Sequence, residues 1–317
     1  VNICPSVTWN IVIKKILPIL NWLPDYTRQT LSGDIVAGIT VAIMIIPQSM
    51  AYALLAGLSP EIGLYASIVP MMLYALFGSS RYLAVGPVAL VSLMTASVMG
   101  EVTATGSADY HTGALIIALL SGVLLIIMSL ARLGVLATLL SKPILSGFTS
   151  AAAIIIGLSQ LKYFLGMTIP SGLNSFEKLY YAASHWQESN LLALIVGIAS
   201  IFIILSSGGV LKRFLTRLNL STIFVNVMSK LGPLFAVAIF TIASWYFGWH
   251  DAFNLRIVGD IPSGLPSFGM PALEQDLVWE LLGPAILIAL VGTIESISVA
   301  KSLASKEREK IEPNKEL

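Results

Sequence analysis

A single carboxylate stands out among the residues that could do chemistry. Glu295 is the only acid well inside the long apolar stretch 279–303, where Thr293, Ser296 and Ser298 are its neighbours in the chain. A lone carboxylate in hydrocarbon is costly and by default marks a transport pathway or a proton-binding site. We therefore predict that Glu295 is a proton-coupling group and that Ser296 hydrogen-bonds a substrate. A structural carboxylate, permanently paired with a basic residue, is the alternative.

A second candidate site begins at Gly86-Pro87. The stretch from Pro87 to Gly100 is fourteen residues long. As a helix it would measure about 21 Å, which is too short to cross a membrane. Proline is favoured at the first helical position, so we predict a half-helix over 87–99 that starts at Pro87. The unpaired N–H groups and partial positive charge of such a start suit an anion, which assigns Gly86, Pro87, Val88 and Ala89 to substrate binding.

Other interpretations of this segment stay open. It could be a re-entrant structural element, a full span that starts near Tyr82, or a loop-to-helix junction with water on its amides. A short hydrophobic segment bounded by Gly and Pro is nevertheless typical of the broken helices at transporter binding sites.

Gln48 and Tyr52 form a third candidate set. They lie four residues apart and would share one face of a helix, directly after Pro47, which favours a kink. An amide and a phenol hydroxyl suit a partly dehydrated anion, so both are assigned to substrate binding. Tyr52 could instead be a packing residue, and Gln48 a structural amide.

The elements that position these residues follow from composition. Hydrophobic residues make up 56% of the 317 positions and charged residues only 11%, whereas a soluble domain carries about 25% charged residues. The apolar residues fall in blocks of about twenty, the length of a membrane span. We therefore expect an all-α polytopic membrane protein, because irregular backbone cannot face lipid.

Several function classes are disfavoured by the same inventory. The net charge of +1 favours no nucleic-acid partner, and the single Cys and three His show no metal-ligand spacing. No nucleophile–base pair, phosphate loop or cofactor motif is present, so we expect neither an enzyme nor a cofactor.

The distribution of basic residues tests the predicted spans. With the N-terminus in the cytoplasm, fifteen of the eighteen Lys and Arg residues fall on the inner side and three on the outer side. This is a strong positive-inside bias. The eight predicted spans are 34–56, 61–78, 87–99, 112–131, 143–165, 190–207, 231–249 and 279–303.

The predicted organisation divides the chain into five segments. They are a cytoplasmic or interfacial segment 1–30, a transmembrane repeat 31–249 with seven spans, an extracytoplasmic loop 250–278, the eighth span 279–305, and a cytoplasmic loop 306–317. The chain starts with Val1 and stops soon after the eighth span, so we expect a fragment that inserts in the membrane but does not transport alone.

Several runs resemble the SulP (sulfate permease) family of anion transporters. They occur in the family's order, from the first span to the last residues of the chain. The runs are Asp34 to Pro60, Gly63-Leu-Tyr65, Phe77 to Arg81, Gly86 to Met94, Val258 to Pro266, Val291 to Lys301 and Pro313 to Leu317.

The resemblance implies a fourteen-span fold made of two inverted seven-span repeats, of which this chain would hold the first repeat and span eight. A core domain, with spans one to four and eight to eleven, would move against a gate domain, and the anion would lie between the half-helices of spans three and ten. Family members usually also carry a cytoplasmic STAS domain after the last span.

The predicted function is secondary active transport of an inorganic anion, with sulfate as the first choice, by proton symport or anion exchange and an elevator or rocking motion. Bicarbonate/chloride exchange and dicarboxylate transport are alternatives on the same scaffold, and an anion channel or voltage-responsive motor is a weaker one. The expected partners are the anion, protons, the lipid bilayer and a second copy in a homodimer. The expected location is an inner or plasma membrane.

Overall fold

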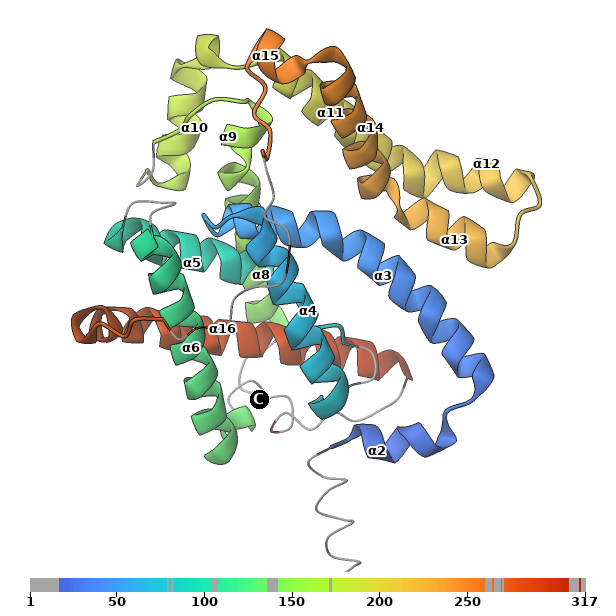
Figure 1. The fold of residues 1–317 in the computed structure, drawn as a ribbon, viewed down its shortest axis with the longest axis vertical. Coiled ribbons are helices and arrows are strands. Elements are labelled where there is room, and N and C mark those ends of the chain that lie inside the picture. The colour runs from blue at the N-terminus through green and yellow to red at the C-terminus, as the bar shows by residue number, and fades with distance from the viewer. Residues whose placement is uncertain are drawn as a thin grey trace, which may run out of the picture. The chain divides into compact units, whose positions relative to one another are not determined.

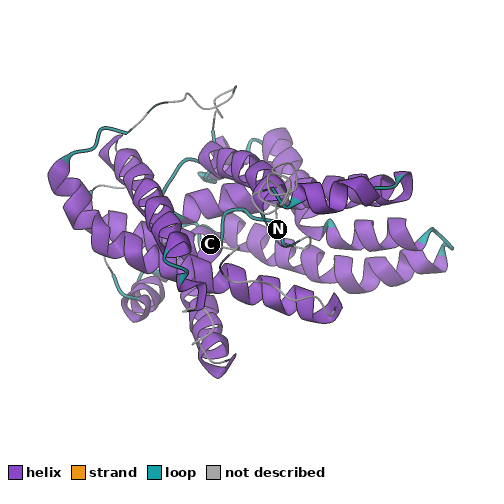
Figure 2. Ribbon diagram, turned by 90° about the horizontal axis from the view of Figure 1, so that it is seen from below, coloured by secondary structure: helices purple, strands orange, loops and turns teal. Residues whose placement is uncertain are grey.

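The computed structural model of the chain describes residues 17–78, 80, 83–103, 108–135, 142–170, 173–259, 264, 269, 271–307 and 314. Within these residues the chain is helical and contains no strand (Figure 2). Two compact units are distinguished: one comprises residues 1–31, 52–151 and 264–317, and the other residues 32–51 and 152–263. Each unit is described by itself below.

Helices form in each segment where the sequence predicts a span (Figure 1). Those of the first unit are α2 (Ile19–Trp22), η1 (Leu23–Asp25), both ends of α3 (Arg28–Leu55), α4 (Pro60–Phe77), α5 (Ala89–Val102), α6 (Ala108–Leu130), η2 (Leu133–Val135), the start of α8 (Lys142–Ser159) and α16 (Gln275–Glu307). Those of the second unit are the middle of α3, the end of α8, α9 (Leu161–Phe164), α10 (Ser175–Ser184), η3 (Trp186–Glu188), α11 (Leu191–Ser206), η4 (Ser207–Leu211), α12 (Lys212–Arg217), α13 (Thr222–Lys230), α14 (Gly232–Phe247) and α15 (Trp249–Phe253).

The described helices include five that are long and apolar enough to cross a membrane: α3, α4, α6, the run from α11 to α12, and α16. The pair α13 and α14 would make a sixth span, bent by 56° at its break. Two apolar helices are shorter, α5 and the run 153–164. A chain with this set of helices is a multi-pass membrane protein, because exposed apolar helices of this length need lipid around them.

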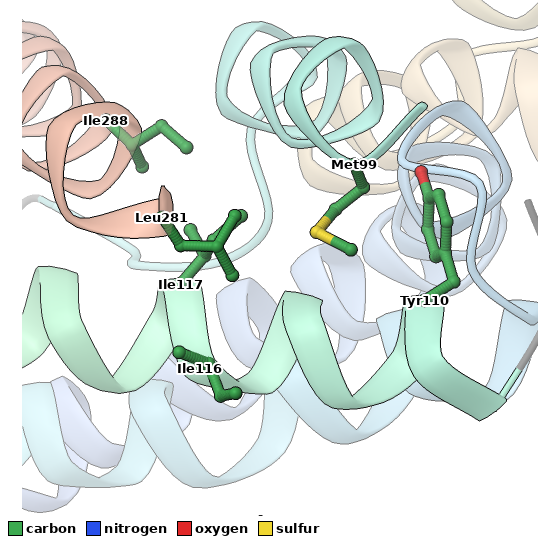
Figure 3. Close-up of a cluster of buried hydrophobic side chains, with 6 residues drawn as sticks. All are labelled: Met99, Tyr110, Ile116, Ile117, Leu281 and Ile288. Carbon is green, nitrogen blue, oxygen red and sulfur yellow. The ribbon is translucent and has the colours of Figure 1, made fainter. Parts of the chain in front are cut away.

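Apolar packing of α5 and α6 against α16 builds the core of the first unit. The buried side chains are Met99 from α5, Tyr110, Ile116 and Ile117 from α6, and Leu281 and Ile288 from α16 (Figure 3). Two long-range hydrogen bonds add to this core: the Tyr110 hydroxyl donates to the Ala56 carbonyl at 2.6 Å, and the Ser121 hydroxyl to the Ala285 carbonyl at 3.2 Å. The short helix α5 is therefore held by two longer ones.

The helix starts follow ordinary capping chemistry. The Thr27 hydroxyl accepts from the Thr30 amide at the start of α3, and Asn174 with Glu177 forms a capping box at the start of α10. These side chains satisfy backbone donors that a helix start leaves unpaired. At the start of α5 no side chain makes a cap hydrogen bond, as is also the case at the starts of α4 and α14.

Candidate functional site

The candidate site is built around the first turn of α5. Val88 is its N-cap, with an extended backbone (φ −124°, ψ 136°), and the first hydrogen bond of the helix runs from the Ser92 amide to the Val88 carbonyl at 3.0 Å. The N–H groups of Ala89, Leu90 and Val91 precede that bond and have no intrahelical partner. This turn therefore presents donors and the positive end of the helix dipole.

The predicted start of the half-helix at Pro87 is wrong by two residues. The predicted half-helix covered residues 87–99, whereas the helix has 14 residues and runs from Ala89 to Val102. A β-branched Val88 favours the extended backbone that an N-cap adopts, so the helix begins after it. Pro87 and Gly86 lie in the segment leading to the helix, where both are half-buried. The donors of this turn therefore come from Ala89 onward.

α16 approaches this first turn at a glycine. A Cβ atom added at Gly292 would lie 3.8 Å from Cγ2 of Val91. Val91 also packs on the cluster that contains Ile288, one turn earlier in α16. Residues three and four positions after Gly292 share its face of the helix, and they are Glu295 and Ser296. The structure thus brings the start of α5 and the helical face that carries Glu295 together.

Polar atoms on this part of α16 are buried without partners. Oε2 of Glu295 and Oγ1 of Thr293 have no hydrogen-bond partner among the described residues. Thr293 is 9% exposed, and Glu295 and Ser296 are half-buried. A buried polar atom that lacks a partner carries a free-energy cost, so such atoms in a native protein call for a ligand, a proton or water.

The two helical segments combine positive potential with a carboxylate and contain no Lys or Arg. Residues 86–95 and 288–298 contain Glu295 as their only ionisable side chain. Among the described residues, no group of three or more His, Cys, Asp and Glu side chains could hold a metal ion. The chemistry on offer is therefore hydrogen bonding from backbone amides and hydroxyls, with a carboxyl group that can hold a proton.

Gln48 and Tyr52 are placed less fully. Both lie on α3, which continues as a helix through Pro47, so they are one turn apart on the same face. Gln48 is exposed and Tyr52 is half-buried. Gln48 belongs to the second unit and Tyr52 to the first. Their role in binding stays a prediction.

One residue at the meeting of the two helices was missed as a site residue from the sequence. Gly292 was quoted only as part of a motif, whereas Thr293 was considered as a hydroxyl that could bond the anion or Glu295. The signal of Gly292 is positional: a glycine three residues before a membrane carboxylate lies on the same helical face and lets a neighbouring helix approach closely.

The comparison with protein families decides the identity of the fold. Residues 31–317 match the family described as the sulfate permease family. The chain belongs to the sulfate permease family. Its name denotes permeases and not enzymes, in agreement with the sequence prediction.

Individual relatives show how much of the family architecture is present. The chain is 39% identical over 311 residues to "Sulfate transporter 4.1, chloroplastic" of Arabidopsis thaliana, covering 96% of this chain and 43% of the relative. It is 35% identical over 298 residues to "Probable sulfate transporter Rv1739c" of Mycobacterium tuberculosis, covering 92% and 49%. The chain therefore spans less than half the length of these relatives.

A solved structure confirms the fold class. The structure of SLC26A9 superposes with a TM-score of 0.83 at 24% identity, covering 99% of this chain and 50% of that one. A likeness at this identity shows the all-α transporter fold. The partition into two seven-span repeats lies beyond what this half-length match establishes.

Proposed function

We propose that the full-length protein is a secondary active transporter of an inorganic anion, with sulfate as the first substrate to test. The observation that carries this proposal is the uncapped first turn of α5 beside the face of α16 with Glu295. Helix starts bind oxyanions through N–H groups and the dipole, without a permanent cation that would trap the anion. Both relatives described above are named as sulfate transporters.

The same geometry favours proton symport. An ionised Glu295 near the anion would repel it; at a separation of about 4 Å the repulsion would be about 4 kcal/mol at an effective dielectric constant of 20. A protonated Glu295 removes that repulsion and can donate a hydrogen bond from its carboxyl group. Anion and proton would then bind and leave together as the core moves against the gate.

The other partners and the location are proposals on the same basis. The anion would be surrounded by Gly86, Pro87, Val88 and Ala89 and would accept a hydrogen bond from Ser296. The expected assembly is a homodimer in an inner or plasma membrane. One relative is named as chloroplastic, so the choice of membrane is tested by locating the tagged protein in its own cell.

Reconstitution tests the proposed function. The full-length protein is placed in liposomes, and uptake of radiolabelled sulfate is measured with and without an inward proton gradient. We expect saturable uptake that the gradient accelerates and that excess unlabelled sulfate blocks. Bicarbonate, chloride and a dicarboxylate are added as competitors in separate arms. If saturable sulfate uptake does not depend on the proton gradient but requires an anion inside the liposomes, the mechanism is anion exchange and not proton symport. A non-saturable leak of sulfate would indicate a channel.

A further inference from the structure

An apolar groove lies in the second unit, far along the chain from the residues of the candidate site. The groove is open on one side and its volume is about 560 Å³, which is within the range of about 300–1,000 Å³ that is usual for small-molecule sites. The groove is formed by α11, η4, α12, α13 and α14. Its apolar lining includes Phe202, Val210, Phe214, Phe224, Met228 and Phe235.

A break in helical geometry creates the groove. Residues Ser207–Leu211 form a π-helical turn, η4, which links α11 to α12. The Ser207 hydroxyl is buried and donates to the Ile204 carbonyl at 2.7 Å. Gly232 of α14 comes so close to Ser207 that a Cβ atom there would clash with the hydroxyl. The hydroxyl of Ser207 is therefore satisfied by the backbone, and apart from Ser206 and Ser207 every residue of the lining is apolar.

Four basic residues lie on the two short helices α12 and α13, which both contribute to the lining of the groove. Lys212, Arg213 and Arg217 on α12 and Lys230 at the end of α13 are all exposed. No Asp or Glu occurs between residues 189 and 250. Figure 1 shows α12 and α13 side by side, so the four cations belong to one helical hairpin. The positive-inside bias assigns this hairpin to the cytoplasmic face.

The hairpin carries its apolar and basic groups on the same short elements. On α13, Phe224 and Met228 are four residues apart and both line the groove, and Lys230 is the last residue of the helix. On α12, Phe214 and Leu215 line the groove between the three basic residues. A ligand that fits both must have a hydrocarbon part and an anionic part.

We propose that this groove holds an acyl chain of an anionic phospholipid whose phosphate contacts the basic residues of α12 and α13. The occupant is argued from charge complementarity: clusters of Lys and Arg at the cytoplasmic end of a membrane helix recognise anionic headgroups, and the groove supplies a hydrocarbon surface beside them. The site is separate from the proposed anion site, and its test does not depend on transport.

Photolabelling tests the proposal. The full-length protein is placed in phosphatidylcholine nanodiscs with a small share of a phosphatidylglycerol that carries a diazirine on one acyl chain. After illumination, mass spectrometry locates the crosslinks. We expect labelling of peptides within residues 202–239, and a phosphatidylcholine probe of the same acyl structure should label them at least about tenfold less.

Variants distinguish recognition of the lipid headgroup by the basic residues from binding of the acyl chain in the groove. The triple change Lys212→Gln, Arg213→Gln and Arg217→Gln should lower phosphatidylglycerol labelling of the groove by about tenfold. The matched triple Lys162→Gln, Lys178→Gln and Arg256→Gln removes the same charge from the same unit and should leave the labelling unchanged. Val210→Trp should block the groove, whereas Ile198→Trp, on an exposed face of α11 outside the lining, should not.

Two outcomes would overturn the proposal. Equal labelling by the phosphatidylglycerol and phosphatidylcholine probes would show an apolar surface without headgroup recognition. So would labelling that the triple change of Lys212, Arg213 and Arg217 leaves unaltered. Crosslinks on other lipid-facing helices but none in the groove would show that protein covers it, either another segment of the full-length protein or a second copy.

Discussion

The first turn of α5 and the hairpin of α12 and α13 both present positive potential, but they make it differently. At α5 the potential comes from backbone amides, and residues 86–95 and 288–298 contain neither Lys nor Arg. On the hairpin it comes from Lys212, Arg213, Arg217 and Lys230. A helix end carries roughly half a charge, whereas each side chain carries a full one.

This difference matches two kinds of occupancy. A transported anion must be released within each cycle, so partial charges and hydrogen bonds serve it better than a buried cation. A lipid that stays in place can tolerate several full charges at the membrane surface, where solvent screens them. In the proposed mechanism, Glu295 beside the first turn of α5 would let that site change its charge by one proton.

The largest expected effect follows from removing that proton-binding group. Glu295→Gln keeps the shape of the side chain but cannot exchange a proton, so the acceleration of sulfate uptake by an inward proton gradient should be lost. Uptake in liposomes is measured across a pH series, with Glu280→Gln, an exposed acid of the same helix, as the control. A Glu295→Gln protein that still responds to the gradient like the unmodified protein would remove Glu295 from coupling.

A smaller effect is expected where the two helices meet. Gly292→Leu would force a branched side chain against Val91 at the start of α5, a kind of overpacking that costs about 1–3 kcal/mol. The apparent affinity for sulfate should fall, while the labelling of the lipid groove stays normal. Gly292→Ala is the control, because its Cβ would make an ordinary contact at 3.8 Å. If the Leu variant binds sulfate normally, this contact does not shape the site.

The smallest effect is expected at Gln48. Removing one hydrogen bond to a charged ligand costs about 1.5–3 kcal/mol, and the exposure of Gln48 places Gln48→Ala at or below the low end of that range. Gln29→Ala, on the same helix, controls for changes in α3. The measurement is the concentration of sulfate that half-saturates uptake. An unchanged value with normal protein levels would take Gln48 out of the binding site.

The helices were predictable from sequence because their signal is strong and one-dimensional. Blocks of about twenty apolar residues can pair their backbone N–H and C=O groups in lipid only by forming helices. The family motifs occur in the order that the family shows, which supports the assignment of the spans. The start of α5 was missed by two residues because Gly86-Pro87 and Val88 give competing local preferences. Proline favours a helix start, whereas a β-branched residue favours the extended N-cap that the structure shows.

Contacts between distant segments could not be predicted in the same way. The approach of Gly292 to Val91 joins residues about two hundred positions apart, and it depends on how α5 packs against α16. The groove lies beside a π-helical turn, η4, and no residue pattern in 207–211 predicts that turn. Glu295 could be proposed from sequence because the cost of a carboxylate in hydrocarbon does not depend on knowing its neighbours, and its role stays a prediction.

The central claim is that backbone N–H groups at the start of α5 bind the anion. Ala89→Pro tests it most directly, because proline at the first helical position removes one N–H and fits the helix geometry, and the extended backbone of Val88 suits the residue before a proline. Ala89→Val adds comparable bulk but keeps the N–H. Sulfate dissociation constants of both purified variants are measured by equilibrium binding. The account predicts that Ala89→Pro weakens binding about tenfold or more, and that Ala89→Val changes it by about twofold at most. Equal affinities for the two variants, both close to that of the unmodified protein, would contradict it.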